Sequence, residues 1–373
     1  MKILITGGHL TPALALIDFI RANHPADEII FLGRKYSQID EHQLSQEQQE
    51  ISWRKIPFID LPAVKGDKSN WIIFPRFLFK FIKSISVAGN ILRQQRPDVI
   101  MSFGGYLALP VALAAWLQKI PIVTHEQTRE PGIANYLISR LAVKIGLSFI
   151  DTTKKFPAHK VQVVGAPLRS KLFELAPTPS WWKSNGRLPL LFISGGNQGS
   201  LFINNLVIKI LPELTKNFFV VHQCGNPLSS HDYLASSAAA KSKLPVSQQD
   251  NYYFQTWFIQ PEQAWIYQQA SVVMTRSGAN TVSELASFKI PSLLIPLPNS
   301  RHQEQIKNAQ WLVEQSPTKI IRQDQLQPQR VITILKELSR QPKANLALTS
   351  IKNKQNQTLA DIYSLIQTAS ITT

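Results

Sequence analysis

Two strand–glycine-turn–helix units, almost two hundred residues apart, constrain the fold of this chain more than any other feature. The apolar run Lys2–Ile5 leads into Thr6–His9, which holds two glycines, and a helical apolar pattern follows. Leu188–Ile193 leads in the same way into Gly195–Gly199 and a second helical pattern. A glycine turn lets the backbone approach a ligand, and the N–H groups of the following helix suit an anion. We therefore predict two doubly wound α/β domains that face one cleft and bind a nucleotide-linked substrate.

Strand and helix patterns alternate through both halves, which indicates parallel sheets with helices on both faces. In the first half we predict strands at 2–6, 28–33, 98–102, 120–124 and 144–149, and helices at 11–23, 75–95, 107–118 and 132–141. In the second half we predict strands near 190–194, 217–222, 252–255, 271–275, 291–295 and 318–321. The polar stretch Ser229–Asp250 is typical of a helix end and surface loop, and residues 344–366 of an amphipathic helix.

Composition limits the class of protein. A chain of 373 residues, 44% of them apolar, suits two domains that each bury a core. The single cysteine, Cys224, excludes an internal disulfide framework and a cysteine zinc site. Neither a secretory signal nor a bilayer-spanning apolar run is visible, so we expect a cytoplasmic protein. The net charge of +16 suits phosphorylated substrates, an anionic membrane surface or solubility alone, and the dispersed basic residues do not indicate nucleic acid.

Candidate site residues in the first half follow the ends of three predicted strands. His9 either takes a proton from an acceptor hydroxyl or merely closes its turn. Gly104 and Gly105 either donate backbone N–H groups to a phosphate or form a plain tight turn. Glu126 is a candidate base or a ligand for sugar hydroxyls, and Asn135 is placed to reach the same cleft from a helix.

Candidate residues in the second half follow the strand Ser271–Met274. Gly278 opens a turn before a helix, whose N–H groups suit a pyrophosphate. Glu284 lies in that helix and is suited to accept two hydrogen bonds from a ribose diol. Gln305 and Asn308 begin a later helix and suit sugar hydroxyls. The alternatives are a capping turn with an exposed glutamate and a solvated helix start.

One segment indicates contact with a membrane. Trp71–Lys83 holds five aromatic residues, three cations and no acid, which is more apolar surface than a core helix needs. Such a helix suits a membrane interface, with lipid phosphates bound by its cations; an internal helix is the alternative. Trp116, on a nearby helix, extends the patch or belongs to the core. The predicted membrane residues are Trp71, Phe74, Arg76, Phe77, Phe79, Lys80, Phe81, Lys83 and Trp116.

Taken in chain order, these motifs resemble the MurG family of bacterial N-acetylglucosaminyltransferases, from Thr6 to about Ala309. The motifs that carry the resemblance are Thr6–His9 with Pro12–Ala13, Gly104–Tyr106, His125–Gln127 with Asn135, Gly165–Arg169, Gly195–Gly199, Arg276–Glu284, and Gln305 with Asn308–Ala309. The resemblance implies two Rossmann-like domains in the glycosyltransferase B fold, residues 1–163 and 164–346, with 347–373 crossing back to the first domain.

The resemblance implies an inverting enzyme that moves GlcNAc from UDP-GlcNAc to undecaprenyl-pyrophosphoryl-MurNAc-pentapeptide (lipid I), giving lipid II in peptidoglycan synthesis. This step serves cell-wall biogenesis, cell shape and cell division, and the enzyme is peripheral on the cytoplasmic face of the inner membrane. No cofactor or bound metal is required, although a divalent cation can stimulate the reaction. His9 would be the general base, with Glu126 as its rival, and Arg169 with the helix N-termini would stabilise the departing diphosphate.

The resemblance also assigns binding roles. The glycine loops at residues 7–8 and 104–105 would bind the acceptor's pyrophosphate, Ile259 would meet uracil, and Gln305 would hold the donor sugar. The full set of implied substrate-binding residues is Thr6, Gly7, Gly8, Gly104, Gly105, Tyr106, Thr128, Asn135, Arg169, Asn197, Gln198, Gly199, Ile259, Arg276, Ser277, Gly278, Ala279, Asn280, Thr281, Val282, Ser283, Glu284, Gln305 and Asn308.

The chain departs from the family in three places. The first glycine loop lacks the usual glycines before Thr6, Thr128 replaces an asparagine, and Asn197 replaces a serine. Three other functions stay open: a glycosyltransferase with another glycolipid acceptor, a UDP-GlcNAc 2-epimerase, and a non-enzymatic membrane-docked nucleotide-sugar sensor. A dinucleotide oxidoreductase is not indicated, because none of the glycine loops has the G-x-G-x-x-G spacing.

Overall fold

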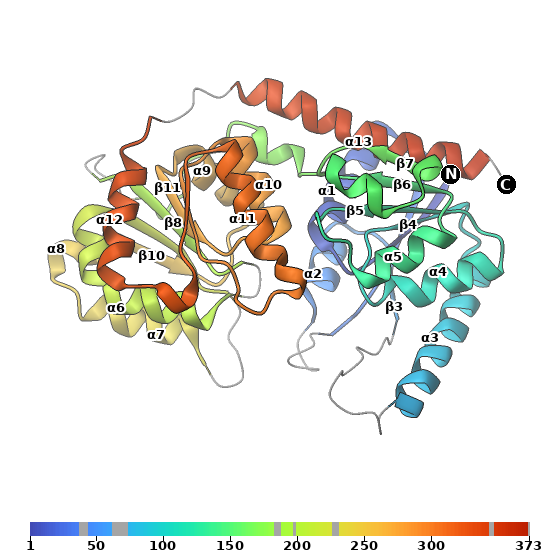
Figure 1. Ribbon diagram of the computed structural model, residues 1–373, viewed down its shortest axis with the longest axis horizontal. Coiled ribbons are helices and arrows are strands. Elements are labelled where there is room, and N and C mark those ends of the chain that lie inside the picture. Colours follow the sequence, from blue (N-terminus) through green and yellow to red (C-terminus); the bar gives the residue numbers. More distant parts are fainter. Residues whose placement is uncertain are drawn as a thin grey trace. The chain divides into compact units, whose positions relative to one another are not determined.

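The computed structural model describes residues 1–36, 44–61, 74–182, 188–196, 199–225, 231–342 and 347–371 (Figure 1). The chain divides into two compact units. Unit 1 comprises Met1–Arg169 and Lys354–Thr373, and unit 2 comprises Ser170–Asn353. These divisions fall a few residues after the boundaries at 163/164 and 346/347 that the sequence predicts.

Unit 1 is built on a parallel seven-stranded sheet in the order β3-β2-β1-β4-β5-β6-β7. Five predicted strands are present, as β1 (Lys2–Thr6), β2 (Glu28–Gly33), β4 (Val99–Ser102), β5 (Ile122–Glu126) and β6 (Lys144–Leu147). The sequence did not predict β3 (Phe58–Asp60) or β7 (Val161–Val163). Each is a three-residue strand at an edge of the sheet, and three residues are too few to show a period.

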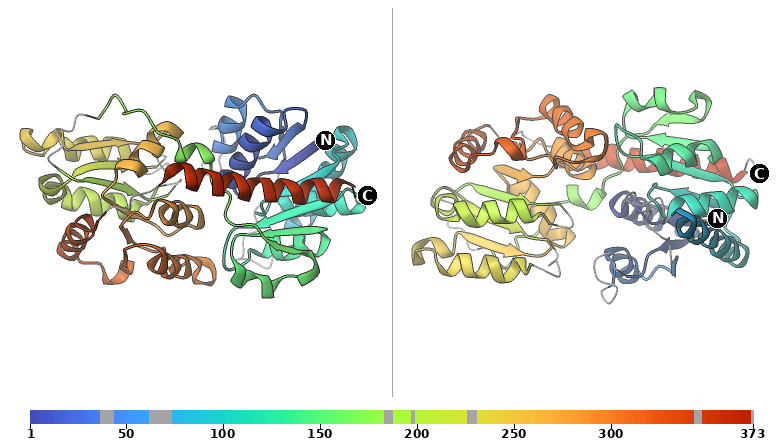
Figure 2. Two further views of the ribbon diagram at one scale, coloured as in Figure 1. Left: turned by 90° about the horizontal axis from the view of Figure 1, so that it is seen from above. Right: turned by 60° about the horizontal axis from the view of Figure 1, so that its bottom comes forward.

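Helices cover both faces of this sheet (Figures 1 and 2). Alternate residues of β1 point to opposite faces. Ile3 and Ile5 pack in one core with α1 (Leu10–Asn23) and α13 (Leu348–Ile371). Leu4 packs in the other core with α3 (Phe74–Gln95), α4 (Ala108–Leu117) and α5 (Ile133–Leu141). Among the described residues of unit 1, the sequence did not predict the α-helix α2 (Gln46–Trp53).

The carboxyl-terminal helix packs on unit 1, as predicted for residues 347–373. From Lys354 onward α13 belongs to unit 1, and Leu359, Ile362 and Ile366 are fully buried in its core. Tyr363 stacks on His24, with ring centroids 3.8 Å apart, and its hydroxyl donates a hydrogen bond to Asp27. Figure 2 shows this helix lying along unit 1.

Unit 2 repeats the architecture with a parallel six-stranded sheet in the order β10-β9-β8-β11-β12-β13. Its strands are β8 (Leu190–Ser194), β9 (Phe219–Gln223), β10 (Tyr252–Gln255), β11 (Val272–Thr275), β12 (Ser292–Leu294) and β13 (Thr318–Ile320). Its helices are α6 (Leu201–Asn217), α7 (Tyr233–Ser242), α8 (Val246–Gln249), α9 (Gln260–Gln269), α10 (Ala279–Phe288), α11 (Glu304–Gln315) and α12 (Pro328–Ser339). On one face of the sheet, α6 and α12 close the core.

The prediction of a surface loop over most of Ser229–Asp250 was wrong, because α7 and α8 lie there. Asp232 caps α7 by accepting a hydrogen bond from the Ala235 N–H at 3.0 Å, and the helix interior is rich in alanine. Tyr233 and Ser237 are buried against unit 2. The short apolar face of this helix left no clear period in the sequence.

A buried histidine makes unit 2 sensitive to acid. His222 accepts or donates hydrogen bonds at both ring nitrogens, with the Tyr252 hydroxyl at 2.9 Å and the Asn204 side-chain oxygen at 3.1 Å. Burial lowers the pKa of His222 to about 3, so the ring stays neutral in the folded unit. An unfolded histidine has a pKa of about 6.5. Below that pH the unfolded chain binds a proton at His222 that the folded unit does not bind, so unfolding is favoured.

We therefore expect the stability of unit 2 to fall as the pH is lowered from 7 to 5. The contribution of His222 is fully present above pH 6.5 and is lost toward pH 3, at a slope of about 1.4 kcal/mol per pH unit. Cys224, the one cysteine of the chain, is buried in this unit, so the urea concentration at which its thiol becomes reactive measures the unfolding midpoint. In a His222→Gln variant the midpoint should vary less with pH. An equal pH dependence in the two proteins would contradict this assignment.

Candidate active site

The strand order of each sheet reverses at one point, and the candidate residues follow the strands on either side of it. In unit 1 the reversal lies between β1 and β4, where Thr6 pairs with Ser102. In unit 2 it lies between β8 and β11, where Ser194 pairs with Thr275. Ligands of open parallel sheets bind beyond the carboxyl ends of the strands at such reversals. Each unit therefore has one candidate site, built from the loops after these strands.

The first two glycine loops of unit 1 touch. Gly8 has φ +132°, and a Cβ added to it would lie 2.2 Å from the carbonyl oxygen of Gly104. A Cβ on Gly105, at φ +85°, would lie 2.8 Å from the Cα of Gly8. Only glycine fits where two backbones come this close in such conformations. The structure thus brings together the two loops that the sequence assigned to one site.

The third loop of unit 1 begins later than predicted. β5 runs to Glu126 rather than ending at residue 124, so His125 and Glu126 are the last residues of the strand. Pairing with β6 holds them, since His125 is opposite Gly146 and Glu126 opposite Leu147. Because His125 and Glu126 are polar, the sequence predicted that the buried strand would end before them.

Glu126 is saturated with hydrogen bonds. One carboxylate oxygen accepts from the Thr128 N–H at 2.8 Å and the Thr128 hydroxyl at 2.6 Å. The other accepts from the Gly132 N–H at 3.3 Å and the Asn135 side-chain amide at 3.0 Å. Asn135 also donates to the His125 carbonyl and accepts from Thr124. These donors occupy the lone pairs that a base would need, so Glu126 is better suited to order this loop than to remove a proton.

His9 has the properties of a neutral base. It is the residue before α1, its side chain makes no capping hydrogen bond, and the residue as a whole is partly exposed. Burial lowers the pKa of His9, and the charge of Glu126 acts in the opposite direction. The net lowering leaves the imidazole unprotonated near neutral pH, as a general base requires.

Three buried polar atoms near these strand ends have no hydrogen-bond partner among the described residues: Thr6 Oγ1, His125 Nδ1 and Gln127 Oε1. His125 donates from Nε2 to the Gly165 carbonyl at 3.1 Å, which leaves Nδ1 as an acceptor. Burial lowers the pKa of His125 to about 4, so this ring is neutral as well. Buried polar groups normally have partners, and unsatisfied ones at the carboxyl ends of β1 and β5 favour a polar ligand at this edge of the sheet.

In unit 2, β8 ends in the glycine turn before α6. Gly196 and Gly199 have φ +86° and +76°, and the Gly196 N–H donates to Ser194 Oγ at 3.0 Å. Ser200 caps α6. Asn197 and Gln198, which the sequence assigned to the donor site, lie outside the described residues.

The second turn of unit 2 leads into α10. Gly278 is the residue before the helix, and it has no side chain that could cap the first N–H groups. Glu284 is only 4% exposed and accepts a hydrogen bond from the Tyr267 hydroxyl at 2.8 Å. Asn280 and Thr281 are partly exposed, whereas Val282 is fully buried. The Ser283 hydroxyl donates a hydrogen bond to the Ala279 carbonyl within the helix, and Ala279 itself is buried.

Several other residues that were predicted to bind the sugar donor hold the turn between β11 and α10 in place. Arg276 donates to the carbonyls of Ile295 and Pro296, to Ser200 Oγ and to Gln323 Oε1. Asn308 is 1% exposed and donates to the Ser277 carbonyl at 3.1 Å. The side-chain oxygen of Gln305 accepts from the Leu297 N–H at 3.0 Å. Their polar atoms fix the shape of the site.

Two other residues that were predicted to bind the sugar donor lie outside the turn between β11 and α10. Ile259 precedes α9 and is 62% exposed. Arg169 is buried and is the last residue of the first segment of unit 1, although the sequence placed it in the second domain.

Tyr267, Gln323 and Glu47 were not predicted from the sequence, although they contact predicted site residues. Tyr267 lies on α9, Gln323 begins a short 3-10 helix after β13, and Glu47 lies on α2. None belongs to a glycine motif. The proximity of Tyr267 to Glu284 depends on how α9 and α10 pack, which no local pattern encodes.

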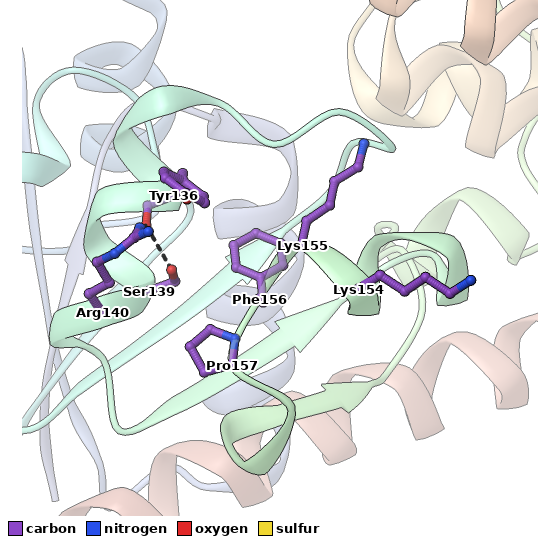
Figure 3. Close-up of a pocket in the computed structure, with 7 residues that line it drawn as sticks. All are labelled: Tyr136, Ser139, Arg140, Lys154, Lys155, Phe156 and Pro157. Carbon is purple, nitrogen blue, oxygen red and sulfur yellow. Dashed lines mark hydrogen bonds between the residues drawn. The ribbon is translucent and has the colours of Figure 1, made fainter.

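A separate basic pocket of about 230 Å³ lies beside α5 in unit 1 (Figure 3). The Arg140 guanidinium lies 3.9 Å from the Tyr136 ring centroid and donates to the Tyr136 carbonyl, and Lys155 pairs with Glu130. None of its lining residues was predicted to bind substrate. The lining residues are Tyr136, Ser139, Arg140, Lys154, Lys155, Phe156 and Pro157.

Two features are absent from the described ranges. No three or more His, Cys, Asp or Glu side chains there are placed to hold a metal ion. No helix in that part of the chain is long and apolar enough to cross a membrane.

Each unit matches a known domain family. Residues 6–147 match the glycosyltransferase family 28 N-terminal domain, and residues 190–366 match the glycosyltransferase family 28 C-terminal domain. The fold and these two matches define the class of the protein, a family 28 glycosyltransferase.

Individual relatives narrow the class. The UDP-N-acetylglucosamine--N-acetylmuramyl-(pentapeptide) pyrophosphoryl-undecaprenol N-acetylglucosamine transferase of Lawsonia intracellularis is 35% identical, over 83% of this chain and 79% of the relative. The enzyme of the same name from Lachnospira eligens is 28% identical over 98% of both chains. The crystal structure of MurG from Acinetobacter baumannii has the same fold, with a TM-score of 0.63 at 23% identity, over 99% of this chain and 100% of that one. The chain belongs to the MurG family of N-acetylglucosaminyltransferases, which confirms the resemblance seen in its motifs.

Proposed function

We propose that this protein transfers GlcNAc from UDP-GlcNAc to lipid I, an undecaprenyl-pyrophosphoryl-MurNAc-pentapeptide, and so makes lipid II for peptidoglycan. The names of its relatives state this donor and this acceptor, which supports both. In the chain itself, the observation that carries the proposal is the pair of strand-order reversals, each lined by glycine turns. One reversal serves each substrate.

The donor is assigned to unit 2. The N-terminus of α10, where the preceding residue is Gly278, suits the pyrophosphate of UDP-GlcNAc, because its N–H groups and the helix dipole favour an anion. Glu284, oriented by Tyr267, suits the ribose diol. Arg276 and Asn308 act indirectly, by holding the turn between β11 and α10.

The acceptor is assigned to unit 1, and His9 is its base. The neutral imidazole takes the proton from the acceptor's sugar hydroxyl as that oxygen attacks the anomeric carbon of GlcNAc. The bond from the anomeric carbon to the diphosphate breaks in the same step, UDP leaves with the electron pair, and the configuration inverts. Glu126 keeps the neighbouring loop ordered through its four donors. The mechanism needs no covalent intermediate and no metal.

The identity of the product tests this proposal. We expect a short-chain lipid-linked muramyl-pentapeptide to gain one N-acetylhexosamine when incubated with the protein and UDP-GlcNAc, with or without a chelator, as measured by mass spectrometry. A 2-epimerase would instead convert UDP-GlcNAc to its epimer without an acceptor. A nucleotide-sugar sensor would bind UDP-GlcNAc and leave the acceptor unchanged.

The acceptor's lipid places the reaction at a membrane, and we assign the docking surface to two helices of unit 1. Leu78, Phe79 and Ile82 on α3 are 46%, 70% and 56% exposed. Trp116 and Leu117 at the end of α4 are 55% and 66% exposed. These five residues, here called the α3/α4 patch, lie on helices that pack together and are joined by a hydrogen bond from Gln118 to the Gly89 carbonyl.

The surroundings of the α3/α4 patch suit an anionic lipid surface. Lys80 and Lys83 are exposed on the same helix as Phe79, whereas Phe81 is partly buried. Apolar side chains with cations beside them enter the headgroup region and bind lipid phosphates. Trp71 lies outside the described residues, and the side chains of Phe74, Arg76 and Phe77 are not described.

A charge reversal in the patch should release the protein from lipid. We expect Phe79→Asp to weaken binding to vesicles containing phosphatidylglycerol by about tenfold or more, because an apolar anchor is lost and a negative charge faces an anionic surface. Co-sedimentation with the vesicles measures the effect. Val246→Asp is the matched control, because Val246 is 84% exposed on α8 of unit 2. Equal binding by the two variants would exclude the α3/α4 patch as the docking surface.

A further inference from the structure

A carboxylate from outside the glycine motifs lies in the first glycine loop. Glu47, in the first turn of α2, accepts a hydrogen bond from the Gly8 N–H at 2.9 Å and another from the Arg34 N–H at 3.1 Å. The Gly7 N–H is also engaged, with the Leu32 carbonyl at 2.7 Å. The N–H groups that the sequence assigned to the acceptor's pyrophosphate at residues 7–8 are therefore already bound within the protein.

The start of α2 is tied to the chain that follows β2. Ser45 caps the helix by accepting from the Gln48 N–H at 3.1 Å. Its own hydroxyl donates to the Arg34 carbonyl, and its N–H donates to the Lys35 carbonyl at 2.8 Å. These bonds direct the first turn of α2, and with it Glu47, toward the carboxyl ends of β1 and β2.

Two glycines leave room for this carboxylate. A Cβ on Gly7 would lie 2.8 Å from both carboxylate oxygens of Glu47, and a Cβ on Gly33 would lie 2.8 Å from one of them. Burial raises the pKa of Glu47, while the N–H bonds from Arg34 and Gly8 act in the opposite direction. The partly buried carboxylate thus occupies the position that a bound anion would take.

Gly8 is fixed from two sides. Glu47 accepts a hydrogen bond from the Gly8 N–H, and the backbone of Gly104 and Gly105 packs closely against Gly8. His9 follows directly and begins α1. Because the peptide between Gly8 and His9 is planar, any shift of Gly8 moves the imidazole.

We propose that Glu47 is a positioning residue for the transfer reaction: its carboxylate fills the anion site of the first glycine loop, fixes Gly8 and so aims His9. This inference rests on the proposed role of His9 as the base. The acceptor's diphosphate must then bind without the Gly8 N–H. Arg34 extends the arrangement to the second glycine loop, since its guanidinium donates to the Tyr106 hydroxyl at 3.2 Å.

Removal of the carboxylate and its replacement in solution test the proposal. Glu47→Ala should lower kcat by about 10- to 100-fold through misplacement of His9, with the KM for UDP-GlcNAc unchanged. The variant leaves a vacancy the size of a carboxylate against two N–H groups, so added formate should restore most of the lost kcat, whereas equal chloride should not. The wild type should not respond to formate. The Glu47→Gln side chain fills the vacancy, but its amide NH2 group faces one of the two backbone N–H groups, and two donors cannot form a hydrogen bond. The kcat of this variant should therefore fall, and formate should not restore it.

Glu50→Gln is the matched control. Glu50 lies on the same helix and pairs with Arg54, so the variant removes one acid from α2 while leaving the glycine loop intact. Glu47 variants as active as this control would overturn the proposal. A lower acceptor KM in Glu47→Ala without loss of kcat would also overturn it, because Glu47 would then only repel the acceptor's phosphates. A wild type that transfers no GlcNAc would instead refute the proposed function, so the two failures are distinguishable.

Discussion

Replacing His9 with alanine is expected to lower kcat for GlcNAc transfer by about 10²- to 10⁴-fold, the range that general-base catalysis contributes. The acceptor hydroxyl then attacks without a group to take its proton. The binding of UDP-GlcNAc should be unchanged, because the donor is assigned to unit 2. Steady-state kinetics with saturating acceptor, together with calorimetric titration of the donor, measure the two quantities separately.

The pH dependence of kcat/KM tests the role of His9 in a second way. Burial lowers the pKa of His9, and a base works only when unprotonated. Wild-type kcat/KM should therefore stay level as the pH falls from 8 through 6.5 and decline only below the ordinary histidine pKa of about 6.5. In His9→Ala this limb should disappear.

Glu126 provides the comparison for His9. Its four hydrogen bonds argue for an ordering role, so Glu126→Gln should lower kcat less than His9→Ala. It should keep an acid limb, shifted to lower pH, because the charge of Glu126 that raises the pKa of His9 is removed. The opposite ranking, with transfer surviving in His9→Ala and abolished in Glu126→Gln, would make Glu126 the base.

Replacing Glu284 with alanine is expected to weaken UDP-GlcNAc binding by about 100-fold or more. A carboxylate that accepts two hydrogen bonds from a ribose diol contributes roughly 1.5–3 kcal/mol per bond, and every 1.4 kcal/mol is about tenfold in Kd. Titration calorimetry with UDP and with UDP-GlcNAc measures the loss. Both ligands should weaken equally, since both carry the ribose.

Two variants bracket that result. Tyr267→Phe removes only the hydroxyl that donates to Glu284, so binding should weaken several-fold rather than a hundredfold. Glu213→Gln should have no effect, because Glu213 is exposed on α6 and pairs with Lys216. Unchanged UDP affinity in Glu284→Ala would show that the buried carboxylate supports the fold of α10 and does not contact the ribose.

The features that the sequence predicts well are those encoded in one stretch of chain. The turns at Gly7–Gly8 and Gly195–Gly196 are recognisable because a strand, a turn and a helix need different residues in fixed order. The long strands β1, β2 and β8 occur as predicted, since their apolar runs are bounded by turn residues. The fold class follows from this alternation alone.

The features that it misses depend on packing between distant stretches. Glu47 reaches Gly8 across 39 positions of sequence, through a short helix whose pattern gave no signal. Tyr267 meets Glu284 because two helices pack together. Asn308, predicted to bind sugar, is instead buried against the Ser277 carbonyl. Side-chain polarity marks a residue as a candidate, but only the packed structure distinguishes a ligand contact from a structural hydrogen bond.

The decisive measurement for GlcNAc transfer is the release of UDP from UDP-GlcNAc with and without a short-chain lipid-linked muramyl-pentapeptide. We expect rapid release that requires the acceptor and matches the amount of disaccharide product. Binding of UDP-GlcNAc without acceptor-dependent release of UDP would contradict it.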